Sequence, residues 1–116
     1  MRPKSGAVRF AERELHGIDH GGLLERIVVW IERRPGALWA VGRAVNPDRG
    51  TSSAGRRTEY VFEGYELDDA LEAANTTLED DVVVSEADGR SQHVRPFTRD
   101  ELLKPLERWF FGHRAS

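Results

Sequence analysis

The feature that most constrains the fold of this chain is a pair of apolar segments joined by a proline-glycine step. Residues 23–34, LLERIVVWIERR, concentrate β-branched residues and a tryptophan, as buried strands do. Residues 37–46, ALWAVGRAVN, form a second apolar run, and Pro35 and Gly36 suit the two central positions of a tight turn between them. We therefore expect these segments to pair as antiparallel strands.

Both faces of this strand pair are apolar. On the first segment, Val28 and Trp30 point to one face, and Ile27, Val29 and Ile31 point to the other. On the second segment, Trp39 and Val41 point to one face, and Leu38 and Ala40 point to the other. A sheet with one face in water alternates apolar and polar residues, so here each face needs a cover. A helix can cover one face. We expect the other to be covered by the C-terminal helix, by a second subunit or by stacked bases of single-stranded nucleic acid.

Two further segments are expected to extend the pair into a sheet. Residues 7–15, AVRFAEREL, alternate Val8 and Phe10 with smaller or polar neighbours. Residues 57–65, RTEYVFEGY, show the same period of two. The sequence therefore predicts an antiparallel meander of three or four strands.

The hydrophobic period lengthens in the segment that follows. Apolar residues recur there at three- and four-residue intervals, namely Leu67, Ala70, Leu71, Ala74 and Leu78. They form one stripe along a helix that can cover a face of the sheet. Residues 81–94, DVVVSEADGRSQHV, then predict a small β-hairpin with Asp88 and Gly89 in its turn.

The last predicted element is a helix that begins at Arg99. Thr98 can cap its first turn, and Glu101 can bond back to the cap from three residues on. Phe97, just before the cap, can pack onto Leu102.

These elements predict the α+β class: an antiparallel sheet of three to four strands packed by a middle helix, then a small β-hairpin and a C-terminal helix. A length of 116 residues fits a single domain over residues 7–116, with a flexible tail at residues 1–6. The chain has no cysteine, which excludes disulfides and thiolate chemistry. No apolar run is long enough for a signal peptide or a membrane helix, so we expect a cytoplasmic protein that does not bind membranes.

The segment NPDRGTSSAGRR, residues 46–57, joins two predicted strands and has two interpretations. In the first interpretation, its arginines and the upstream Arg43 surround an anion or the phosphates of a nucleic acid, and a tryptophan of the sheet stacks on bases. The candidate residues are Arg43, Arg49, Arg56, Arg57, Trp30 and Trp39. A long glycine- and serine-rich connection is more often a mobile surface loop. We predict mobility, with trypsin cleaving first after Arg49, Arg56 or Arg57.

A second candidate site is the segment HGIDH, where His16, Asp19 and His20 carry metal-ligand chemistry if the loop curls back on itself. The glycines around them oppose a helix that would align the two histidines. We therefore predict no metal site and no other cofactor. The carboxylates Glu79, Asp80 and Asp81 oppose the dipole at the end of the middle helix, and we expect them to be solvated.

Residues 26–80 resemble the WGR domain, through LWAVGRAVN, a loop, and then YVFEGYELDDALEAANTTLED. In that family, strands that carry Trp-Gly-Arg precede a helix and contribute to nucleic-acid binding in DNA-repair polymerases. Gly42 and Arg43 match the motif, whereas Val41 stands where the family has its tryptophan. The resemblance implies a nucleic-acid-binding module.

Three functions follow, in order of expectation. The first is a small non-enzymatic interaction domain that forms a homodimer or docks onto a protein partner. It is motivated by the two apolar faces of the sheet and by the segment RWFFG, near which Leu103 and Phe111 fall off the main helical stripe. The predicted interface is Leu103, Trp109, Phe110 and Phe111. The second is the nucleic-acid-binding module. The third is a protein that binds a metal or a small ligand. No set of residues predicts a catalytic site, so an enzyme is not expected.

Overall fold

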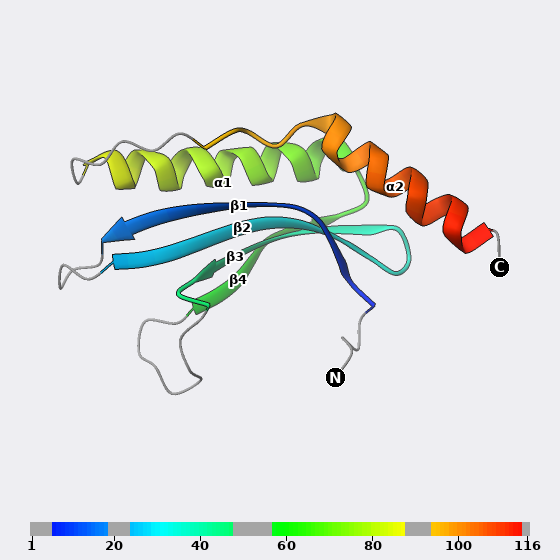
Figure 1. Cartoon of the computed structure of the whole chain (residues 1–116), viewed down its shortest axis with the longest axis horizontal. Helices are drawn as coiled ribbons and strands as arrows, with labels where there is room; N and C mark the ends of the chain where they lie inside the picture. Colours follow the sequence, from blue (N-terminus) through cyan, green and yellow to red (C-terminus); the bar gives the residue numbers. More distant parts are fainter. Residues whose placement is uncertain (1–5, 19–23, 48–56, 88–93, 115–116) are drawn as a thin grey trace.

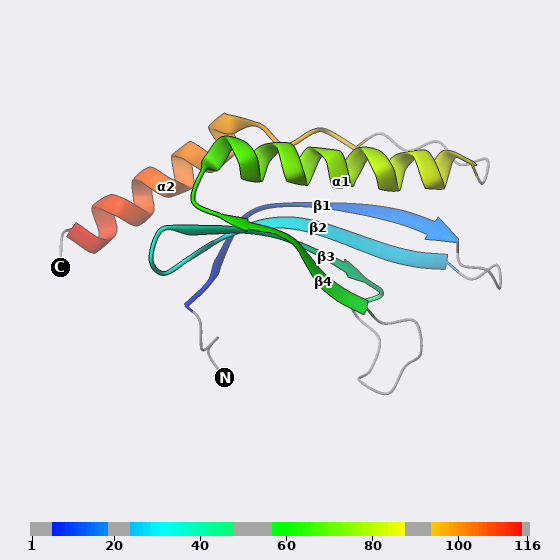
Figure 2. The same ribbon diagram turned by 180° about the vertical axis from the view of Figure 1, so that it is seen from behind.

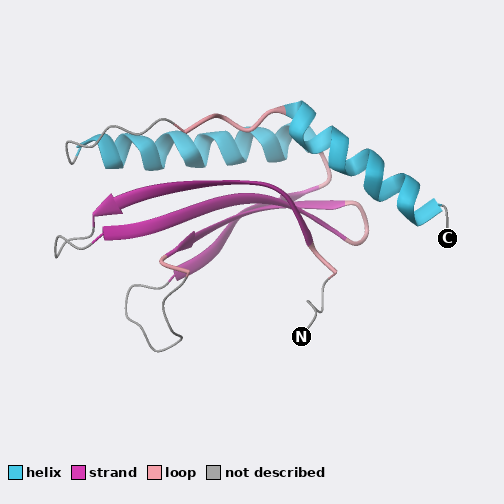
Figure 3. Cartoon of the chain, in the orientation of Figure 1, coloured by secondary structure: helices cyan, strands magenta, loops and turns pink. Residues whose placement is uncertain are grey.

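The computed structural model of the chain describes residues 6–18, 24–47, 57–87 and 94–114. Its elements are β1 (Val8–Ile18), β2 (Leu24–Arg34), β3 (Leu38–Val45), β4 (Arg57–Gly64), α1 (Leu67–Ala87) and α2 (Arg99–Arg114). These strands form an antiparallel sheet in the order β1-β2-β3-β4, and the helices form a second layer (Figure 1, Figure 3). The predicted α+β class and the meander are therefore confirmed.

Helix α1 covers one face of the sheet because its apolar stripe has the helical period. Ala70, Ala74 and Leu78 of this stripe are buried in one core with residues of the strands, among them Val29 and Val41. The helix contacts all four strands. The predicted middle helix is thus confirmed, and the two alanines let it approach the sheet closely.

Helix α2 lies on the same side of the sheet as α1, begins beside the start of α1 and runs away from the sheet (Figure 1, Figure 2). Its predicted start at Arg99 is confirmed. The backbone N–H of Thr98 donates to Glu101 Oε1 at 3.0 Å, and the N–H of Glu101 donates to Thr98 Oγ1 at 3.4 Å. Phe97 and Leu102 are both buried in the core that α1 forms. The predicted capping pair therefore fixes the first turn of α2.

The turn between β2 and β3 differs from the prediction by one residue. Arg34 pairs with Leu38, so the connection has three residues instead of two. Gly36 and Ala37 both have positive φ angles, of 83° and 64°. Because side chains alternate between faces, the added residue changes which residues of β2 and β3 lie opposite each other.

The predicted hairpin over residues 81–94 is wrong in its first half, because α1 continues to Ala87. The β-branched residues after Asp81 favour a strand locally, but two contacts favour the helix. Val82 packs against the core one helical turn after Leu78, and the carboxylate of Asp81 accepts hydrogen bonds from Arg43 on β3. Tertiary contacts thus override the local propensity. The predicted turn, Asp88 and Gly89, lies outside the described residues.

The face of the sheet opposite α1, which we call the open face, is covered by its own side chains. Val28, Trp30 and Ala44 form a separate apolar cluster there and are no more than 5% exposed. The Arg9 guanidinium lies 3.9 Å from the centre of the Trp30 ring, and the Tyr60 ring packs edge-on against it. The C-terminal helix does not cover this face. In the described part of the chain, Trp30 is buried without the C-terminal helix, a second subunit or nucleic acid over it.

Several predictions concern residues beyond those described. The predicted tail at residues 1–6 is described only at Gly6, and the arginine-rich segment 46–57 only at its ends. Its predicted mobility therefore stays a prediction. In the described ranges, no helix is long and apolar enough to cross a membrane.

Candidate interaction surface

The charge of the chain is unevenly distributed. Residues 58–87 contain ten aspartates and glutamates and no lysine, arginine or histidine. The rest of the chain holds all 17 lysines and arginines and the other ten carboxylates. Because residues 58–87 fold into β4 and α1, which pack against each other, the net charge of −3 conceals a strongly acidic region. Its exposed carboxylates, here called the acidic surface, are Glu59, Glu63, Glu66, Asp68, Asp69, Glu72, Glu79 and Asp80.

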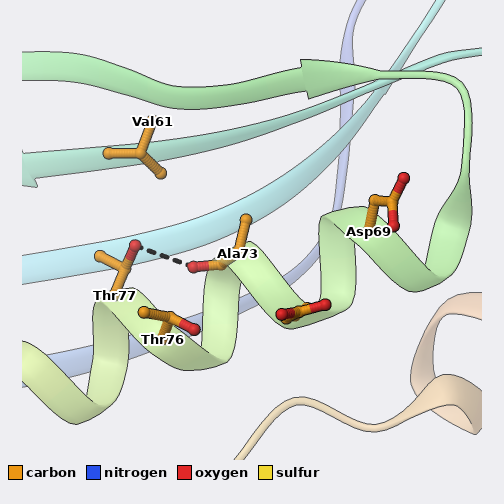
Figure 4. A pocket seen from close by; sticks show the side chains of 6 residues that line it. Val61, Asp69, Ala73, Thr76 and Thr77 are labelled. Carbon is orange, nitrogen blue, oxygen red and sulfur yellow. Dashed lines mark hydrogen bonds between the residues drawn. The ribbon is translucent and has the colours of Figure 1, made fainter.

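A groove of about 340 Å³ lies between β4 and α1 within the acidic surface (Figure 4). Its lining consists of Val61, Asp69, Glu72, Ala73, Thr76 and Thr77. Val61 points from β4 toward α1, and the Thr77 hydroxyl donates to the carbonyl of Ala73 at 2.9 Å. The groove therefore combines an apolar wall with two carboxylates and an exposed hydroxyl, that of Thr76.

Val61 reaches the groove because β4 contains a β-bulge. Val41 pairs with Phe62 and Gly42 pairs with Tyr60, so Val61 has no partner in the β3–β4 ladder. Phe62 packs into the core under α1, whereas Tyr60 packs against Trp30 on the open face. The extra residue leaves Val61 41% exposed beside the helix.

Among the described residues, four carboxylates of this region are paired with cations. The pairs are Asp81 and Glu59 with Arg43, Asp68 with Arg99, and Glu63 with Arg34. Arg43 donates from Nε and Nη2 to Asp81 at 2.9 and 2.8 Å. The hydrogen bond with Asp81 raises the pKa of Arg43, and the charges of Asp81 and Glu59 add to this increase against the opposing effect of burial. Asp81 is buried inside α1, so its predicted solvation at the end of the helix is wrong, and this pairing joins the second half of α1 to β3.

Asp69 and Glu72 differ from these four carboxylates. Within the described ranges, no cation and no hydrogen-bond donor contacts either side chain. Both are exposed at the groove, close to the apolar side chain of Val61. An uncompensated carboxylate pair beside an apolar wall suits an ammonium or guanidinium group on an aliphatic stem.

Of the residues predicted to bind an anion or nucleic acid, those that the structure describes are not gathered in one place. Trp30 lies on the open face and is 2% exposed, whereas Trp39 lies under α1 and is 1% exposed. Arg43 is held by Asp81 on the same side as Trp39. Arg57 is exposed at the start of β4, and Arg49 and Arg56 lie outside the described residues. Stacking of bases on either tryptophan would require the ring to leave its buried position.

The buried Glu32 explains part of this arrangement on the open face. Its carboxylate accepts hydrogen bonds from Trp30 Nε1 at 2.7 Å, from Arg34 Nε at 2.7 Å and from the Tyr60 hydroxyl at 3.3 Å. The hydrogen bond with Glu32 is the main cause of the raised pKa of Arg34. These contacts hold the Trp30 ring on the open face beside Gly42, so Glu32 has a structural role here.

The predicted metal candidates are described only in part. His16 lies in β1, with Nε2 3.6 Å from Glu14 Oε2, while Asp19 and His20 lie outside the described residues. Throughout the described segments, no group of three or more histidines, aspartates and glutamates is placed to hold a metal.

The predicted interface residues all lie in α2. Leu103 is half-buried, and the helical backbone continues through Trp109, Phe110 and Phe111, whose side chains are not described. The interface prediction therefore stays a prediction.

The groove residues Asp69, Glu72 and Val61 were not predicted as a site. The first signal that could have found them is the run of thirty residues without a cation, which is visible in the sequence. The bulge at Val61 has no such signal, because it depends on how β3 and β4 pair. Comparison of the chain with family models, with curated proteins and with solved structures finds no match in any of the three, so none supports the resemblance to the WGR domain.

Proposed function

We propose that this chain is a non-enzymatic protein-interaction domain whose acidic surface binds a positively charged segment of another protein. The observation that carries the proposal is the groove between β4 and α1, in which Asp69 and Glu72 have no cation partner among the described residues and lie beside Val61. Such a surface attracts a basic partner over a distance and then offers it a short apolar contact.

The charge of the acidic surface also indicates the kind of partner. Two copies that met through this surface would bring carboxylates together, which costs free energy at neutral pH. Nucleic acid is repelled by it for the same reason. A basic protein segment is the class of macromolecule that this surface favours.

Self-association is a second candidate function, and it concerns a different part of the chain. Helix α2 packs mainly against β1 and then runs away from the sheet (Figure 2). The sequence places Trp109, Phe110 and Phe111 in its distal part. Sedimentation equilibrium of the chain and of a variant with these three residues changed to serine tests this candidate, since only the first is expected to dimerise.

A selection of peptides tests the proposed basic partner. Random linear peptides displayed on phage are selected on the immobilised full chain at low salt, and the affinity of the selected peptides is measured by fluorescence anisotropy. We expect lysine and arginine to be enriched. We also expect the affinity to fall by about tenfold or more when salt rises from about 50 to about 300 mM, because the attraction is electrostatic.

Matched variants show whether the groove is responsible. The double variant Asp69→Asn/Glu72→Gln should weaken peptide binding by about tenfold. The control Glu12→Gln/Asp100→Asn removes the same charge from β1 and α2 and should change it by less than about twofold. Equal weakening by both variants would reduce the effect to net charge and contradict the proposal. So would peptides without basic residues, or binding of a single-stranded oligonucleotide in place of the peptides.

A further inference from the structure

We propose that β4 receives the basic segment as an added fifth strand, paired along the free edge of the sheet. This inference rests on the proposed function and specifies how the partner binds. It combines the open edge of β4, the position of the groove beside that edge and the sign of the charges along it.

The edge of β4 has unpaired backbone groups. β4 is the last strand in the order β1-β2-β3-β4, so it pairs with β3 on one side only. The hydrogen bonds of the described residues include none to its outer backbone groups. Five of its eight residues, from Arg57 to Val61, are consecutively exposed. An exposed edge of this kind is a template for another strand.

The opposite edge of the sheet, at β1, carries the arginines Arg9 and Arg13. α2 packs against β1, and the Arg13 guanidinium donates to the backbone carbonyls of Arg95 and Pro96 in the segment before α2. Arg13 also forms an ion pair with Glu101. A basic strand would therefore meet cations of the chain itself at β1, whereas residues 58–64 of β4 carry none.

The groove lies where alternate side chains of an added strand would point. Successive side chains of a strand face opposite sides of the sheet. Those that face α1 would lie over Val61 and beside Asp69 and Glu72. Those that face the other way would lie beside Tyr60, which is 47% exposed. Lysine or arginine at every second position is the pattern that fits.

The charges of β4 disfavour a second copy as the added strand. Pairing of two β4 strands would bring the acidic surfaces of two copies side by side, which costs free energy at neutral pH. Bulges and charges are the devices by which proteins keep edge strands from unselective pairing. Here the carboxylates repel a second copy and attract a basic strand.

Backbone methylation of a selected peptide tests strand addition. A peptide from the phage selection is synthesised with a single N-methyl group at each position in turn, and its affinity for the full chain is measured by anisotropy. Methyl groups on amides that face β4 remove a donor and block the approach of the two strands. We expect losses of about tenfold or more at alternate positions and of less than about twofold at the positions between them.

Amide hydrogen exchange of the chain provides a second measurement. With the unmodified peptide bound, backbone amides of β4 should gain protection, whereas amides of β1 should not. Losses that are equal at all positions, or no gain of protection in β4, would overturn strand addition while the charge-dependent binding of the proposed function stands. Failure to select any basic peptide would overturn the proposed function itself.

Discussion

At the scale of single residues, the open face depends on one glycine. A Cβ atom placed on Gly42 would lie 2.2 Å from Cζ2 of Trp30, so the indole ring occupies the space that any other side chain would fill. Trp30 pairs with Gly42 because the turn between β2 and β3 has three residues. A two-residue turn at Pro35 and Gly36 would have placed Trp30 opposite Val41 instead.

This difference marks a limit of prediction from sequence. The alternation that sends Trp30 and Val29 to opposite faces is visible in the sequence, because it follows from the period of a strand. The contact between Trp30 and Gly42 is not visible in the sequence, because it depends on the register in which β2 and β3 pair. That register depends on Ala37, which has a φ of 64°, a backbone conformation unusual for alanine.

The variant Gly42→Ala tests this contact. We expect it to destabilise the fold by about 1–3 kcal/mol, because the ring of Trp30 has to move away from the sheet. The free energy of unfolding is measured in urea. The double variant Gly42→Ala/Trp30→Leu should cost less than the sum of the two single changes, since the smaller side chain leaves space for the methyl group. Strict additivity of the two changes would contradict the close contact.

At the scale of elements, the extent of α1 is the main departure from prediction. The stripe from Leu67 to Leu78 predicts the first part of the helix from the sequence alone. Its last turns are fixed by Val82 in the core and by the contact of Asp81 with Arg43, 38 residues away in the sequence. A contact of that range cannot be read from local propensity.

The variant Asp81→Asn tests how α1 is joined to the sheet. Asp81 is 8% exposed and holds the Arg43 guanidinium through two nitrogens. Its loss leaves a partly buried cation without its main partner, so we expect a destabilisation of roughly 2–3 kcal/mol. Asp80→Asn is the matched control, because Asp80 is exposed, and it should change the free energy of unfolding by less than about 0.5 kcal/mol. Similar losses in the two variants would contradict the role of the ion pair.

The start of α2 predicts a dependence of stability on pH. Burial alone would raise the pKa of Glu101, but the hydrogen bonds from Arg13 and Thr98 and the charge of Arg13 outweigh it and lower the pKa below its ordinary value of 4.5. A depressed pKa in the folded state contributes stability above the unfolded value, and this contribution is lost as the pH falls through the folded value.

The variant Glu101→Gln measures this contribution. Wild-type protein should be more stable than the variant at pH 7, and the difference should shrink once the pH falls below 4.5. Urea unfolding of both proteins at about pH 7 and about pH 3 provides the comparison. Asp100→Asn is the control in the same turn of the helix. A difference between wild type and Glu101→Gln that persists at the lower pH would contradict the argument.

At the scale of the whole molecule, charge and packing divide the chain differently. The acidic region, residues 58–87, is contiguous in sequence, so composition alone is enough to find it. The core instead joins residues from Leu15 to Leu102, so all the described elements depend on one another. The acidic surface is therefore carried by β4 and α1 and is not a separate domain, because both elements pack into the shared core.

This shared core predicts that the chain unfolds in one cooperative step, including α2, although α2 packs mainly against β1. Leu102 is fully buried and ties α2 to the core, so Leu102→Ala should lower the free energy of unfolding by about 2–4 kcal/mol. Leu103→Ala is the matched control and should cost less, because Leu103 is only half-buried. Helical circular dichroism and tryptophan fluorescence should lose their signals at the same urea concentration in wild type and in both variants. If Leu102→Ala lost helical signal well before the fluorescence of Trp30 and Trp39 changed, α2 would be a separate unit and the single domain over residues 7–116 would end before it.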